Sequence, residues 1–158
     1  MAAPTTPIGL NDHRTLLPAT LTDRLVDRIT SEHPELASGM PARILDQTVA
    51  FLGTCATSTE QLGPSPLVDI GWHAFILYTR EYAEFCHRIA GRFIHHVPDD
   101  SPTGDEWPTT PTSGPVTLAA TVSAIGQAGY RVDPQLWSMA AASDCSQCHA
   151  GCHDSPTR

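Results

Sequence analysis

Residues 65–91, SPLVDIGWHAFILYTREYAEFCHRIAG, decide the fold that this sequence predicts. Ser65 suits an N-cap, the proline after it suits a first helical turn, and apolar residues follow at helical spacing. Thr79 offers a second cap, so we expect one helix to end near it and another to begin there. Gly91 is a typical helix stop. The stretch therefore predicts two consecutive helices.

Three more helices are expected outside this stretch. Apolar residues at helical spacing predict one over about 20–32. Pro41 suits the first turn of another, which we expect to stop at Gly53. Thr117 is a suitable cap for the last helix, which should end at Gly129.

The rest of the chain is loop and tail. Residues 98–115 contain five prolines and four acidic residues, which predicts a long Pro-rich loop. A turn near Trp137 should dock this side chain on the domain. A chain of 158 residues is one domain on length alone. The predicted fold is mainly α, a single small helical domain over 1–142, followed by a Cys/His-rich tail at 143–158.

Composition narrows the classes of function. The formal net charge is −8, and all nine basic residues are arginine. An acidic chain without a basic run argues against nucleic acid and anionic membranes as partners. We see no targeting segment and no apolar stretch long enough for a membrane helix, so we expect a cytoplasmic protein. Cysteines are reduced there, and closely spaced ones indicate metal or redox chemistry before disulfides.

A first group of metal-ligand residues lies in the helical stretch. His73 follows Asp69 by four residues, so both share one helix face, and the carboxylate could orient the imidazole of a ligand. An ordinary hydrogen-bonded histidine would show the same spacing. Cys86 lies about 220° from His73 on an unbroken helix, so the two can share a metal only if the helix breaks at Thr79. Otherwise Cys86 is a small buried apolar residue.

The adjacent histidines after Gly91 add one more candidate. Neighbouring side chains of an extended segment point in opposite directions, so at most one of them faces a given site. His95 would continue the face of Phe93, which favours His96 as the ligand. A pair of surface histidines is the alternative interpretation.

The tail carries the strongest motif. Cys145 and Cys148 have the spacing of a chelating pair, and Cys152 follows shortly after. One interpretation is zinc held by three cysteines and a histidine, with an iron–sulfur cluster as a variant. Another is covalent haem, because Cys145 to His149 matches C-x-x-C-H. The third is a redox-active tail without a fixed ligand.

Two motifs also resemble a known family. Residues 68–86 read V-D-x-x-W-H-x-F-I-L-x-T-x-x-Y-x-x-F-C, and residues 93–98 read F-I-H-H-x-P. Both are similar to the central motif of the glycine-rich domain-containing proteins, in particular small bacterial members with a Gly/Cys-rich tail, although this tail is poorer in glycine. The resemblance implies a shared site and no reaction. That site would comprise Trp72, His73, Tyr82, Cys86 and His96.

Together these patterns predict a transition-metal protein, with zinc as the default and iron or copper as alternatives. The expected role is that of an accessory, carrier or sensor. A metal-dependent enzyme acting on a small molecule or peptide in a biosynthetic pathway is the main alternative, and an iron–sulfur or haem redox protein is the other. A protein or peptide partner fits the first role, and the oligomeric state is not predicted. One mixed site and two separate sites stay equally open. The predicted ligands are His73, Cys86, His96, Cys145, Cys148 and Cys152.

Overall fold

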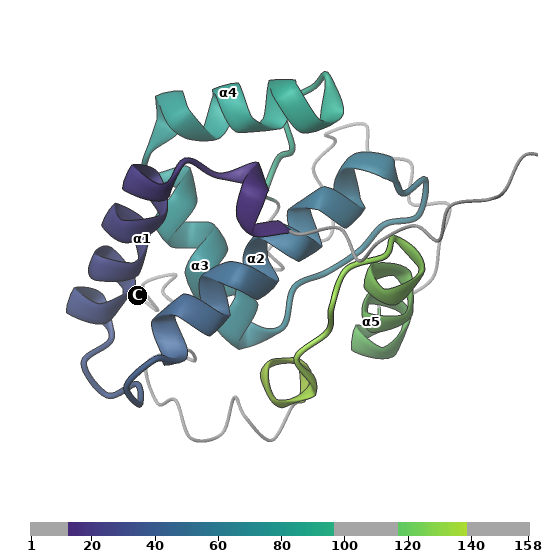
Figure 1. Cartoon of the computed structure of the whole chain (residues 1–158). Coiled ribbons are helices and arrows are strands. Elements are labelled where there is room, and N and C mark those ends of the chain that lie inside the picture. The colour runs from purple at the N-terminus through teal and green to yellow at the C-terminus, as the bar shows by residue number, and fades with distance from the viewer. Residues whose placement is uncertain (1–12, 97–116, 139–158) are drawn as a thin grey trace, which may run out of the picture.

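The chain folds into a helical domain, shown in Figure 1 as a computed structural model. The structure describes residues 13–96 and 117–138, and these contain no strand. The prediction of a mainly α fold is confirmed. The predicted Pro-rich loop and the Cys/His-rich tail lie outside the described residues. The elements are η1 (His13–Leu16), α1 (Ala19–Glu32), α2 (Met40–Thr57), α3 (Pro66–Ile76), α4 (Thr79–Ala90), α5 (Leu118–Gln127) and η2 (Pro134–Trp137).

Helix α2 is the centre of the domain. It packs against α1, α3, α4, α5 and η1, and Figure 1 shows it running through the middle of the molecule. It also continues through Gly53, where the sequence predicted a stop. A Cβ at this position would lie 2.4 Å from the Tyr130 hydroxyl oxygen. Gly53 therefore serves a close approach of Tyr130 to the helix and does not end it.

Helices α2 and α3 approach each other at a second glycine. A Cβ on Gly71 would lie 2.1 Å from the Thr48 hydroxyl oxygen. That hydroxyl is buried and lies 2.8 Å from the carbonyl oxygen of Ile44 and 3.0 Å from that of Val68. The threonine thus joins the backbones of both helices, and only a glycine leaves room for it.

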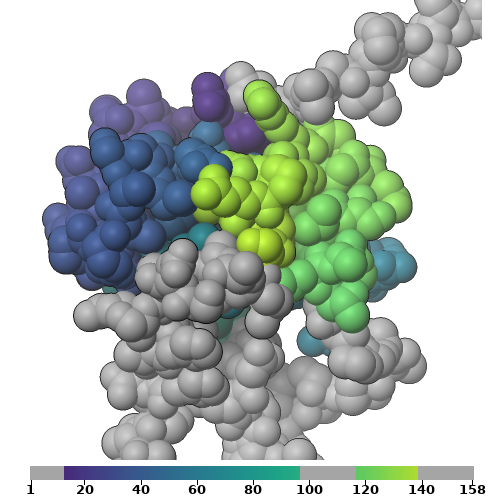
Figure 2. Space-filling view, turned by 90° about the horizontal axis from the view of Figure 1, so that it is seen from below, coloured from purple at the N-terminus to yellow at the C-terminus, as the bar shows by residue number. Residues whose placement is uncertain are grey.

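The last described segment closes the domain beside the start of α3. The Ser65 hydroxyl caps α3 by accepting from the Val68 amide and donates to the Leu136 carbonyl at 2.6 Å. The Trp137 indole donates to Gln47 at 2.8 Å and is 5% exposed, so the predicted docking of this tryptophan is confirmed. In Figure 2 this segment, yellow, fills the surface between the α1–α2 side and α5. No helix within residues 13–96 and 117–138 has the length and apolarity to cross a membrane.

Substitution Gly71→Ala should lower the free energy of unfolding by about 1–3 kcal/mol, because the new methyl group overpacks the contact with Thr48. Gly126→Ala is the matched control, since nothing lies within 4 Å of a Cβ there and alanine favours a helix. Urea denaturation of both variants measures the difference. Equal stability of the two variants would contradict the close α2–α3 contact.

Candidate metal centre

A buried chain of hydrogen bonds fixes the segment that follows α4. The Trp72 indole donates to the Tyr82 hydroxyl at 2.8 Å, and this hydroxyl donates to the Ile94 carbonyl at 2.6 Å. All three residues are buried. Helix α3, helix α4 and the extended chain after Gly91 are thereby joined at one point.

The extended segment places its two histidines on opposite sides. Phe93 and His95 are exposed, and their ring centroids lie 4.8 Å apart. Ile94 and His96 face the domain. The His96 ring packs on Trp72 with centroids 4.4 Å apart, which brings it to the start of α3.

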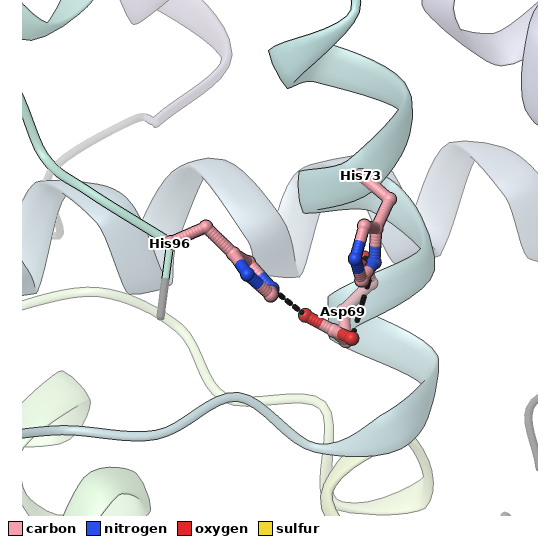
Figure 3. Close-up of side chains that lie close together, drawn as sticks. All are labelled: Asp69, His73 and His96. Carbon is pink, nitrogen blue, oxygen red and sulfur yellow. Dashed lines mark hydrogen bonds and ion pairs between the residues drawn. The ribbon is translucent and has the colours of Figure 1, made fainter. Parts of the chain in front are cut away.

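Asp69 lies between two histidines at this point (Figure 3). Its Oδ1 is 2.6 Å from Nε2 of His96, and its Oδ2 is 3.1 Å from Nδ1 of His73. The same Nδ1 lies 2.9 Å from the backbone carbonyl oxygen of Asp69. Because a carbonyl only accepts, Nδ1 of His73 carries a proton, and in the neutral form of the ring Nε2 then keeps its lone pair. That tautomer is typical of a metal-binding histidine.

The electrostatics of the cluster follow from its geometry. Asp69 is 7% exposed, and burial would raise the pKa of its carboxyl. Hydrogen bonds from His73 and His96, with their positive charges, outweigh burial and lower that pKa to about 2. In return, the hydrogen bond to Asp69 raises the pKa of His73 against the effect of burial. Asp69 is therefore a carboxylate at neutral pH.

The three side chains offer a suitable set of donors for a metal. One ligand atom from each of Asp69, His73 and His96 lies within 4.8 Å of the others. Ligands of tetrahedral zinc lie about 3.3 Å apart when the bonds are about 2.0 Å long. Small side-chain rotations would give that geometry. Without an ion the same residues also form a complete hydrogen-bonded cluster.

The structure brings some of the predicted site residues together and places others elsewhere. It brings His73 and His96 together, with Asp69 beside them as a third donor. Cys86 is not in this group: it is fully buried in the core on α4, beside Phe85. The helix break before Thr79 is present, yet it turns this thiol toward the apolar core, where it packs as a small hydrophobic side chain.

The three tail cysteines, Cys145, Cys148 and Cys152, lie outside the described residues, so their role as ligands stays a prediction. The i, i+4 spacing predicts that Asp69 orients His73. Its contact with His96 depends on the fold and is not visible in the sequence.

Comparison with known proteins identifies one match. A family model described as UCP032817-like matches residues 11–104, which is more than half of the chain. No curated protein and no solved structure matches it. The assignment to the glycine-rich domain-containing proteins was wrong, because the family model that covers both motif segments is this different one. Three of the five motif residues, Trp72, Tyr82 and Cys86, are buried in the core and therefore report helix packing.

Substitution Tyr82→Phe should lower the free energy of unfolding by about 1–3 kcal/mol, because the Trp72 indole and the Ile94 carbonyl lose a buried partner. Tyr130→Phe is the control, since the structure shows no hydrogen bond from its hydroxyl among the described residues. That change should stay within about 0.5 kcal/mol. Chemical denaturation measures the stability of both variants. If Tyr82→Phe leaves the free energy of unfolding unchanged, the hydrogen bonds of Tyr82 do not hold the segment in place.

The metal-free protein should show a pH window in which Asp69 stabilises it. The lowered pKa of Asp69 contributes stability that is fully present above pH 3.8, the ordinary pKa of aspartate, and is lost as the pH falls toward 2. The raised pKa of His73 gives stability that is complete below 6.5 and lost as the pH rises through the folded value. With a chelator present, the stability difference between wild type and Asp69→Asn should be largest between these limits. A difference independent of pH would contradict the ion pairs.

Proposed function

This chain belongs to the UCP032817-like family, and we propose that it binds one transition-metal ion, zinc by default, through Asp69, His73 and His96. The convergence of a carboxylate and two imidazoles at one point supports the proposal. Two of them lie on α3, and the third comes from a segment 27 residues away from Asp69 that buried hydrogen bonds hold in place.

The chemistry of the donors favours a borderline metal. Imidazole and carboxylate suit zinc, and two histidines with one carboxylate also suit iron(II). Copper accepts imidazole as well. The ionised Asp69 need lose no proton before the ion binds, whereas a protonated His73, whose pKa Asp69 raises, must first release one, so binding should weaken as the pH falls.

The exposure of the site suits an accessory, carrier or sensor protein. The His73 side chain is 50% exposed, while that of Asp69 is 11% exposed. An ion held there would be bound by the nearly buried Asp69 and would still be accessible to solvent through His73. Transfer of the ion to a partner protein requires such access. Within this proposal we place the protein in the cytoplasm, where its thiols stay reduced.

A metal-dependent enzyme is the second candidate. Three protein ligands leave a coordination position for water or substrate, as in catalytic zinc sites. Zinc bound there would supply an activated water at neutral pH. A surface cavity of about 420 Å³ is lined by Trp72 and by Cys55, Leu62 and His95; it adjoins the cluster through Trp72, and none of the three donor residues lines it. It would offer room for a small molecule or a peptide side chain.

Substituting both histidines, His73→Ala and His96→Ala, should lower bound zinc by one equivalent in the full chain purified without a polyhistidine tag. Helical content should persist, because neither side chain is part of the apolar core. Elemental analysis measures the metal and circular dichroism measures the helices. His95→Ala is the control, since this neighbouring histidine is exposed and packs on Phe93. Unchanged zinc in the double variant would show that the cluster is only a hydrogen-bonded one.

A further inference from the structure

We propose that the surface cavity beside Trp72 binds a short peptide with free amino and carboxyl ends. The proposal goes beyond metal binding and does not depend on it, because none of the three donor residues lines this cavity. It also names a class of substrate for the enzyme candidate. Two non-helical segments form most of the lining, residues 58–62 after α2 and residues 92–95 after α4.

The first argument is that opposite charges line the cavity without pairing with each other. Arg92 belongs to one segment and Glu60 to the other. Among the described residues, no ion pair joins the two or takes up either of them. Burial raises the pKa of the Cys55 thiol to about 12, so this part of the wall is neutral. A ligand that carries an ammonium and a carboxylate group would therefore pair with both segments.

The second argument is that both charged residues are held in place by their surroundings. The Arg92 guanidinium donates to the Cys55 carbonyl at 3.1 Å, which uses one of its five N–H donors. The Glu60 amide donates to the Ser58 hydroxyl at 3.0 Å, and this hydroxyl lies 3.2 Å from the Glu60 carbonyl oxygen. The loop that carries the carboxylate is thus closed on itself before any ligand binds.

The third argument concerns backbone groups, which favour a peptide over a single amino acid. Within the part of the chain that the structure describes, the backbone N–H and C=O groups of Leu62, Phe93 and His95 form no hydrogen bond. Tyr82 holds the second segment in its extended form through Ile94. Extended segments of this kind bind peptides through main-chain hydrogen bonds.

The size and position of the cavity agree with such a ligand. Its volume of about 420 Å³ lies within the range of about 300–1,000 Å³ that is typical of small-molecule sites. Trp72 and Leu62 give it an apolar surface for ligand side chains. The Trp72 ring also packs on His96 with centroids 4.4 Å apart, so one side chain separates the cavity from the metal cluster.

Titration of the full chain with the tripeptide Leu-Gly-Leu, followed by ¹H–¹⁵N NMR shifts, tests this proposal. Wild type should bind the tripeptide, with shift changes centred on residues 58–62, Trp72 and residues 92–95. The N-acetylated and the C-amidated tripeptide should each bind about fivefold more weakly, because each lacks one charge. Binding should persist with a chelator present, so the result is independent of the metal site.

Two variants match each charge to one end of the peptide. Arg92→Gln should bind the free and the C-amidated tripeptide equally, and Glu60→Gln should bind the free and the N-acetylated tripeptide equally. Arg80→Gln and Glu84→Gln are the controls and should match wild type, since these exposed residues lie on α4 and do not line the cavity. The proposal is wrong if the tripeptide does not bind, if the shift changes lie elsewhere, or if both blocked forms bind wild type as tightly as the free one.

Discussion

The hydrogen bond from the Tyr82 hydroxyl to the Ile94 carbonyl is the constraint on which the site depends. Gly91 ends α4 with φ of 66°, and the chain then runs extended with no strand partner among the described residues. Tyr82 holds it against α3 and is itself held by the Trp72 indole. Burial makes these bonds hard to exchange for water, since each lost partner would leave a polar group unsatisfied. His96 reaches Asp69 because the hydrogen bond from Tyr82 fixes Ile94, two residues before it.

Much of the fold was predictable because the helix ends carry local signals. Ser65 caps α3 and Gly91 ends α4 as predicted, since caps and left-handed stops act within one turn. Helix α4 begins at Thr79, but Thr79 does not cap it: the N-cap position is Tyr78, and no side chain caps the helix there. The predicted helix stop at Gly53 was wrong, because this glycine serves a tertiary contact: Tyr130, far along the chain, packs on it. The short helix η1 was missed for a similar reason. Its buried His13 lies beside Asp46 of α2, and the sequence around His13 does not predict this contact.

The site was predictable only in part. Helical spacing paired Asp69 with His73, and alternation selected His96 over His95, both from local geometry. The convergence of these three residues needs the return of the chain along α3, which spacing alone does not encode. Cys86 could not be assigned from the sequence, because a cysteine buried in the core and a cysteine that binds a metal look alike there. The donor set itself supports metal binding, and whether a fourth protein ligand completes the site decides between a carrier role and a catalytic one.

The most direct test of the metal site is a crystal structure of the full chain grown with zinc, with diffraction data collected on both sides of the zinc absorption edge. The account predicts an anomalous peak about 2 Å from donor atoms of Asp69, His73 and His96. The Asp69 to His96 contact, 2.6 Å in the hydrogen-bonded form, should then open to a ligand–ligand separation. A map with no peak there and the short contact intact would contradict the account.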